Sequence, residues 1–266
     1  EIVAFGELHG NLVGAEAQLT VLKAMHAQGR PVALAMEFME RDTQPAVDSY
    51  LAGKISTEAF KLAARQNKAY PKTHGPLVEF CKANGIPVIA ANAPRRLVSG
   101  YRKQDEDYET YVASLPEEDR GWLPEETSIL EDAYRDRFMK LMGETRGASF
   151  FRSQSLWDDA MAEAMYDFRS EHPDHRILFI VGGFHVESGL GTISKYKLRR
   201  GKDDIRVLIM DMDKDPQLPF RDEDVGKGDL VLKDLSGSVD ASTVEGSIEA
   251  LGRGGRARLT TGNDDI

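Results

Sequence analysis

Residues 176–187 read "RILFIVGGFHVE": an apolar run, two glycines and a histidine. Residues 1–11, "EIVAFGELHGN", repeat this arrangement at the start of the sequence, with Gly6 followed by Glu7, Leu8 and His9. Short apolar runs that end in glycine predict buried β-strands. Because both runs are apolar at nearly every position, they favour strands covered by helices on both faces, which is typical of a parallel sheet.

The segments between these two runs continue the pattern. Further strands are predicted at 30–38 ("RPVALAMEF"), 86–94 ("IPVIAANAP") and 204–213 ("DIRVLIMDMD"), and a short edge strand at 228–235 ("GDLVLKDL"). Helical spacing of apolar residues predicts helices at 14–29, 44–53, 57–67, 75–85 and 153–171. Strands that alternate with helices indicate an α/β fold, with a mostly parallel central sheet flanked by helices.

One segment differs in character. Residues 101–150 are rich in Asp, Glu and Arg and carry no strand signal, so we expect a small inserted helical subdomain. The α/β core would then consist of 1–100 and 151–235. Residues 236–266, in which Gly, Ser and Thr predominate, are expected to form a C-terminal appendage whose composition favours flexibility and to which no role is assigned.

Composition excludes several classes of function. The formal net charge of −10 over 266 residues argues against nucleic acid as a main partner, because phosphate binding needs a basic face. The single cysteine, Cys81, leaves no intrachain disulfide and no site built from several cysteines. No stretch approaches the roughly 20 apolar residues that a transmembrane helix needs, so we expect no transmembrane segment.

Polar residues stand where the predicted strands end. In parallel sheets, ligands bind beyond the carboxyl ends of the strands, and four strands deliver polar side chains there: Glu7 and His9, Glu37, Asn92 and Arg95, and His185. Each has a structural explanation when taken alone; Glu37, for example, could form a buried ion pair with Arg95 or Arg41. Four such cases at one edge favour a true polar site.

Two other features are weaker. Gln154, Asp158, Met161 and Met165 share one face of the predicted helix at 153–171, although a methionine stripe is more often core than ligand. His74 precedes a helix start, where it either faces the site or caps the helix.

The motifs resemble a known superfamily. The resemblance rests on "FGELHGN" (5–11), "ALAMEF" (33–38), "NGIPVIAANAPR" (84–95), "SQSLWDDAMA" (153–162) and "FIVGGFHVE" (179–187). They are similar to the superfamily that joins ChaN-type haem-binding proteins with the Tiki and TraB proteins and the erythromycin esterases. The segments at 85–95 and 153–162 favour the ChaN group, and the likeness does not extend beyond about residue 235.

The resemblance implies haem or iron handling in the bacterial cell envelope, by a periplasmic or lipid-anchored protein whose export signal is not in this sequence. It also implies a ligand cleft between the sheet and a small helical domain. The residues expected to contact haem are His74, Asn92, Gln154, Met161 and Met165. The axial ligand of the iron stays open among His9, His74, His185, Tyr70 and Tyr101.

The superfamily leaves a hydrolase as the alternative. In one form, His9, His185 and Glu37 hold a divalent cation such as Mn²⁺ or Zn²⁺ that activates water. In a metal-free form, His9 is the general base, Glu7 or Glu37 orients it, and Arg95 stabilises an oxyanion. The residues alone favour hydrolysis, whereas the overall likeness favours haem, which we rank first. Whether the chain is an enzyme, and whether it forms a homodimer, both stay open.

Overall fold

A parallel sheet forms the centre of the computed structural model, which describes residues 1–104, 106–200 and 203–210 and the backbone of four short strands after them. The sheet has the strand order β3-β2-β4-β1-β5, and every neighbouring pair is parallel. Its strands are β1 (Ile2–Glu7), β2 (Val32–Glu40), β3 (Val88–Asn92), β4 (Arg176–Gly182) and β5 (Ile205–Ile209). The predicted α/β fold with a parallel sheet is confirmed.

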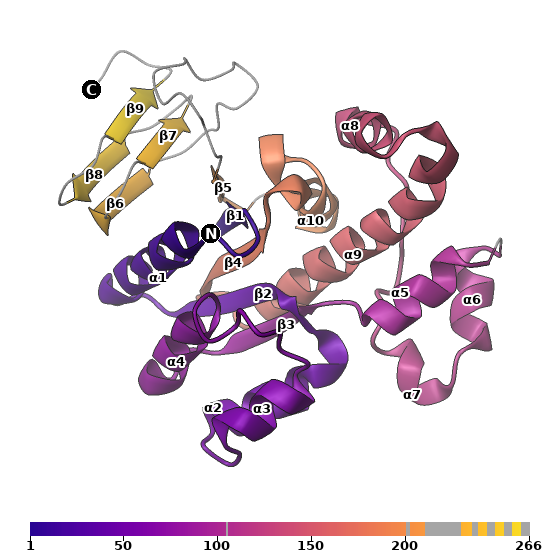
Figure 1. Cartoon of the computed structure of the whole chain (residues 1–266), viewed down its shortest axis with the longest axis horizontal. Coiled ribbons are helices and arrows are strands. Elements are labelled where there is room, and N and C mark those ends of the chain that lie inside the picture. Colours follow the sequence, from indigo (N-terminus) through magenta and orange to yellow (C-terminus); the bar gives the residue numbers. More distant parts are fainter. Residues whose placement is uncertain are drawn as a thin grey trace.

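Helices cover both faces of this sheet (Figure 1). One face packs against α1 (Leu12–Ala27), α2 (Gln44–Leu51), α3 (Thr57–Ala63) and α4 (Gly75–Asn84). The other face packs against α9 (Glu144–Glu171) and α10 (Thr192–Arg200). All seven residues of β4 are buried, as expected for a central strand with helices on either side.

Local sequence signals explain where two helices begin and end. The Asn11 side chain accepts a hydrogen bond from the backbone N–H of Gly14 at 3.0 Å, which caps α1. Gly85 adopts a φ of 64°, a left-handed conformation that ends α4 and that glycine tolerates best. The chain can therefore turn directly from α4 into β3.

A group of helices lies beside the first half of α9 (Figure 1). It contains α5 (Arg95–Arg102), α6 (Tyr108–Ser114), α7 (Glu117–Arg120) and α8 (Ala133–Met142). Apolar side chains of α5 and α6 pack on Leu156 and Ala160 of α9, and α8 packs on Phe151. The segment is helical, as its sequence indicates, while the domain boundaries at residues 100, 150 and 235 stay predictions.

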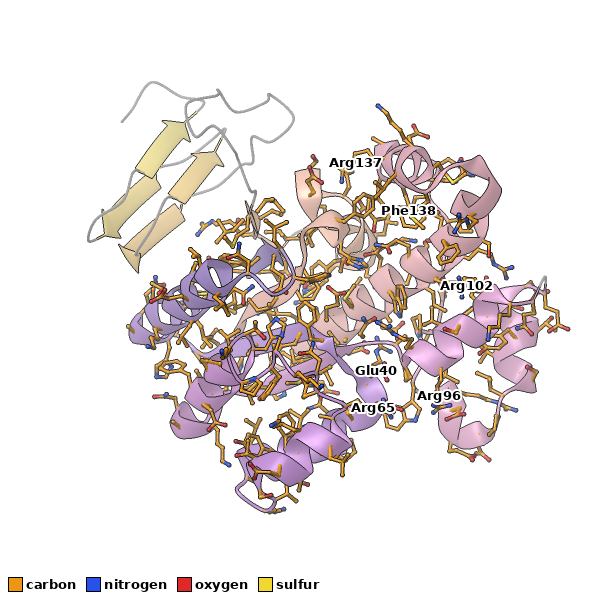
Figure 2. The ribbon with its side chains drawn as sticks, in the orientation of Figure 1. Glu40, Arg65, Arg96, Arg102, Arg137 and Phe138 are labelled. Carbon is orange, nitrogen blue, oxygen red and sulfur yellow. The ribbon has the colours of Figure 1, made fainter. Side chains whose placement is uncertain are left out.

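Charged side chains tie these helices to the core at two places. At the surface, Asp42 pairs with Arg65 and lies 3.8 Å from Arg96 of α5, which also pairs with Asp119 of α7 (Figure 2).

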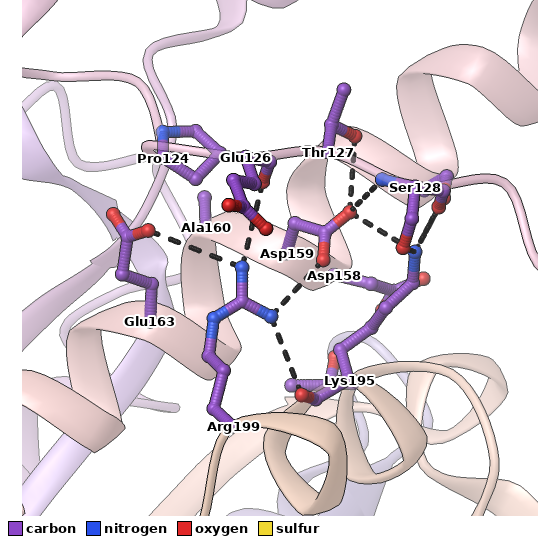
Figure 3. A network of polar contacts seen from close by, with 12 residues as sticks. Pro124, Glu126, Thr127, Ser128, Asp158, Asp159, Ala160, Glu163, Lys195 and Arg199 are labelled. Carbon is purple, nitrogen blue, oxygen red and sulfur yellow. Dashed lines mark hydrogen bonds and ion pairs between the residues drawn. The ribbon is translucent and has the colours of Figure 1, made fainter.

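Deeper in the molecule, Asp159 of α9 accepts hydrogen bonds from Lys195 Nζ, Thr127 Oγ1 and the Ser128 N–H, each at 3.0 Å (Figure 3). Arg199 donates to its other oxygen at 3.2 Å. Asp159 and Lys195 are both buried, and removing one partner of a buried pair is strongly destabilising. The segment at 127–128 is thus fixed between α9 and α10.

The predicted edge strand at 228–235 is placed differently by the structure. Leu230–Leu235 does form a strand, β6, but it pairs with β8 (Ile248–Gly252) in a separate two-stranded sheet. A second small sheet joins β7 (Val239–Thr243) to β9 (Ala257–Thr261). An apolar run identifies a strand but not its partner, and this accounts for the error. Within the described residues, no helix is both long and apolar enough to cross a membrane.

Candidate functional site

The polar residues predicted at strand ends do meet at one edge of the sheet. Glu7 is the last residue of β1 and lies in register with Gly182, the last residue of β4. His9 and His185 follow these two neighbouring strands. On the other side of β4, the pairing of β2 with β3 shifts between Met36 and Glu40, and this irregularity contains Glu37. Such bulges re-aim side chains at strand ends.

Glu7 is the centre of a cluster that joins two histidines. Its Oε1 lies 3.2 Å from Nδ1 of His9, and its Oε2 lies 2.9 Å from Nε2 of His74 and accepts a hydrogen bond from Gln18 Nε2 at 2.8 Å. Burial on its own would raise the pKa of Glu7, but the hydrogen bonds from His74, His9 and Gln18 outweigh it and lower this pKa to about 2. Glu7 is therefore a buried carboxylate that stays ionised.

The two histidines of this cluster differ in exposure. The side chain of His9 is 65% exposed, whereas that of His74 is 6% exposed. Phe38 lies between them: its ring stacks on His74 at 4.0 Å between ring centroids and meets His9 edge-on at 5.4 Å. The hydrogen bond to Glu7 raises the pKa of His9 above its usual value. The result is an exposed imidazole held by a buried carboxylate and an aromatic ring.

His185 belongs to a second, buried cluster. Its Nδ1 lies 2.7 Å from Oδ1 of Asp158, which also accepts a hydrogen bond from Thr192 Oγ1 at 2.6 Å. The other oxygen of Asp158 accepts from the Tyr134 hydroxyl at 2.7 Å, and Gln154 Nε2 donates to that hydroxyl. Burial alone would lower the pKa of His185, but the charges of Asp158 and Glu37 raise it to about 9. His185 is thus a buried cation at neutral pH.

Glu37 lies between the two clusters. Its Oε2 accepts the backbone N–H of Gly182 at 2.5 Å, and its Oε1 is 3.7 Å from Nε2 of His185. A Cβ at Gly182 would stand 2.9 Å from Cε1 of His9 and 3.3 Å from Glu37 Oε2. The absence of a side chain at position 182 therefore lets the His9 ring and the Glu37 carboxylate approach the end of β4.

Comparison with known proteins identifies the family of the chain. Residues 1–195 match the family described as haem-binding uptake, Tiki superfamily, ChaN. The chain belongs to this family. Among curated proteins, no sequence matches the chain.

Solved structures agree with the family at the level of the fold. The chain is similar to the structure of cofacial haem binding to ChaN of Campylobacter jejuni, with 14% identity, a TM-score of 0.56, and coverage of 79% of this chain and 81% of that one. A mutant of the erythromycin esterase EreC matches with 10% identity and a TM-score of 0.45, covering 78% of this chain and 69% of the other. Only the similarity to ChaN has a TM-score high enough to support the fold.

Other residues predicted for this site of the ChaN-family chain are not part of the two clusters. Met161 and Met165 are fully buried in the core between α9 and the sheet. The Oδ1 atom of Asn92 is buried without a hydrogen-bond partner within the described residues. Tyr70 and Tyr101 are also buried, at 2% and 7% exposed, so neither hydroxyl lies open at the surface.

An ion pair of Glu37 with Arg95 or Arg41, the structural alternative for this carboxylate, is not found in the described part of the chain. Arg41 instead donates to Glu163 at 3.0 Å, and Arg95, at the start of α5, is exposed. His185 and the N–H of Gly182 take the place of an arginine.

The hydrolase alternative gains little from the structure. Within the described residues, no group of three or more His, Cys, Asp or Glu side chains is arranged to hold a metal ion. The geometry therefore gives no support to a divalent cation held by His9, His185 and Glu37. The ChaN family match also favours haem over hydrolysis.

Four residues of the two clusters were not predicted: Gln18, Phe38, Tyr134 and Thr192. Gln18 had a signal, because it shares a helix face with the apolar residues Val21, Leu22 and Met25 of α1, where an amide needs a partner. The other three had none, since a single aromatic or threonine is common in any core.

Proposed function

We propose that this chain binds haem at the carboxyl edge of its sheet, as a haem-iron uptake protein of the bacterial envelope. The observation that carries the proposal is the match of residues 1–195 to the haem-binding uptake family, together with an exposed histidine at the edge where parallel sheets bind ligands. The likeness to ChaN supports the fold on which such a site would stand.

His9 is the residue best suited to meet the iron. Metal-ligating histidines characteristically give one ring nitrogen to a carboxylate or carbonyl and the other to the metal. His9 has its Nδ1 on Glu7, and its Nε2 has no hydrogen-bond partner within the described residues. His74 and His185 are buried and each bonds a carboxylate, so a porphyrin could not reach them without rearrangement.

The surroundings of His9 fit a flat apolar ligand. Leu12 and Val13, at the start of α1 and three and four residues after His9, are 54% and 49% exposed, so two large apolar side chains are open to solvent near the histidine. Phe38 adds the edge of an aromatic ring. A haem disc placed over His9 would therefore find an iron ligand and an apolar wall in the same place.

A haemin titration followed by the Soret band tests this proposal. We expect saturable binding to the wild-type chain and at least about tenfold weaker binding to His9→Ala, which corresponds to about 1.4 kcal/mol. His26→Ala is the matched control, because His26 lies in the last turn of the same helix that begins beside His9.

Two outcomes would count against it. Non-saturable uptake of haemin by the wild-type chain would rule out haem binding at a specific site. Equal affinities of wild type and His9→Ala would remove His9 as the ligand and leave the haem site to be sought elsewhere. Fractionation of cells that express the protein tests the envelope location separately, periplasmic or lipid-anchored.

A further inference from the structure

His74 is a buried polar residue at the start of a helix. It immediately precedes α4, yet its side chain does not cap that helix. It is 5% exposed, and its imidazole is committed instead to the carboxylate of Glu7. Keeping a polar ring buried is unfavourable unless its hydrogen bonds are made. The Glu7 contact therefore compensates for the burial of the His74 ring.

Two separate paths join His74 to His9. The first is Glu7, whose Oε2 lies 2.9 Å from Nε2 of His74 and whose Oε1 lies 3.2 Å from Nδ1 of His9. The second is Phe38, whose ring stacks nearly parallel on His74, at 17°, and stands perpendicular to His9, at 90°. Glu7 fixes a hydrogen bond of His9, and Phe38 fixes the plane of its ring. Together they determine the orientation of the exposed imidazole.

We propose that His74 is a positioning residue for His9: it holds one oxygen of Glu7 so that the other accepts the Nδ1–H of His9, which leaves the lone pair of Nε2 facing the ligand. This inference deepens the proposed function and rests on it for the identity of the ligand. Gln18 assists by donating to the same Oε2 at 2.8 Å.

The chemistry of the imidazole and the carboxylate explains how His74 acts on His9 through Glu7. A neutral imidazole carries its proton on one nitrogen, and the hydrogen bond made by that nitrogen decides which one it is. An ionised carboxylate accepts through both oxygens. With His74 and Gln18 satisfying Oε2, Oε1 is left for His9. Without a donor from His74, Oε2 loses one of its two hydrogen bonds and the carboxylate can rotate, so the tautomer of His9 is no longer fixed.

A pair of substitutions separates the hydrogen bond from the packing. His74→Phe keeps a flat ring to stack on Phe38 but removes the donor, whereas His74→Gln keeps an N–H donor and loses the ring. The first readout is the pair of ¹⁵N chemical shifts of the His9 imidazole without haem, which report the tautomer. The second is haemin affinity. His26→Phe is the control, since His26 also makes an edge contact with a phenylalanine but lies at the far end of α1.

We expect the neutral imidazole of wild-type His9, observed at a pH above its raised pKa, to carry its proton on Nδ1. His74→Phe should give mixed tautomers and weaken haemin binding roughly 10–100-fold, as loss of such supporting partners typically does. His74→Gln should restore the Nδ1 tautomer and most of the affinity, and His26→Phe should change neither. A purely structural role for His74 predicts no rescue by glutamine.

The wild type alone can also overturn the proposal. If its His74 carries no proton on Nε2, the hydrogen bond to Glu7 does not exist as described, and the inference fails even should His74→Phe not fold. An unchanged His9 tautomer in a folded His74→Phe chain would likewise refute it. If the tautomer responds to His74 but wild-type chain takes up no haemin, the positioning stands and the proposed function falls.

Discussion

Two motifs with the same spacing, "GELH" at 6–9 and "GGFH" at 182–185, bring two histidines to one edge of the sheet and give them opposite environments. The side chain of His9 is 65% exposed and that of His185 is 10% exposed. Each has a carboxylate on Nδ1, Glu7 in one case and Asp158 in the other. The difference lies in what covers the ring, not in what holds it.

A residue next to each histidine explains this difference. Phe184, before His185, packs against Tyr134 and Phe138 of α8, so the second motif turns under that helix as the short helix η2 (Gly183–His185). After His9, Gly10 adopts a φ of 78° and leads the chain into α1 at the surface. A repeated motif can thus supply one buried histidine and one accessible imidazole.

The largest effect should come from removing the partner of the buried histidine. Asp158→Ala removes the carboxylate bonded to Nδ1 of His185, leaving Glu37 at 3.7 Å from the ring, and also removes the acceptor of the Tyr134 hydroxyl, so we expect a loss of about 3–5 kcal/mol in the free energy of unfolding. His9→Ala, at the exposed motif, should change it by no more than about 0.5 kcal/mol. Urea denaturation at neutral pH measures both, and equal losses would erase the distinction between the motifs.

The dependence of stability on pH should distinguish the motifs next. The pKa of His185 rises from 6.5 to about 9 on folding, so the folded state favours its protonated form. This contribution, about 3 kcal/mol, is fully present below pH 6.5 and is lost as the pH rises through 9. Unfolding free energies measured from pH 6 to pH 10 should fall for the wild type and for His9→Ala, and fall less for His185→Gln. Parallel curves for all three would contradict the buried cation.

The smallest expected effect concerns the contact between the two motifs, where Gly182 of the second lies against the His9 ring of the first. A Cβ on Gly182 would stand 2.9 Å from the His9 ring, whereas one on Gly183 would find nothing nearer than 3.5 Å. Gly182→Ala should therefore displace His9 and weaken haemin binding about fivefold, which is about 1 kcal/mol, and Gly183→Ala should not. If both glycine variants bind haemin as the wild type does, His9 does not sit against β4 when the ligand is bound.

Sequence reasoning succeeded where the chemistry follows from strand polarity. Parallel strands place their carboxyl ends at one edge, so the convergence of Glu7, Glu37 and His185 could be predicted without a structure. The shared face of Gln154, Asp158, Met161 and Met165 on α9 was also predictable from spacing. The sequence could not show that this face is divided between the site and the core, because the division depends on how far α9 runs under the sheet. Gln154 and Asp158 reach His185 beyond the strand ends, while the two methionines lie beneath the sheet itself.

Other parts of the site depend on loops and could not be predicted. The position of His74 against Glu7 is set by the turns between α3 and α4, whose sequence does not specify a partner 67 residues away. The pairing of β6 was beyond reach for a similar reason, because β-propensity identifies a strand without its neighbours.

The order of strands in the sheet has a consequence for synthesis of the chain. β4 lies between β1 and β2, although it follows both of them by more than a hundred residues. During translation, the apolar first strands therefore have no central neighbour until Gly182 has been made, and at roughly 5–20 residues per second this takes on the order of 10 s. Unpaired apolar strands are prone to aggregate in that interval. The nascent chain should accordingly depend on chaperones until its fourth strand emerges and closes the sheet from the middle.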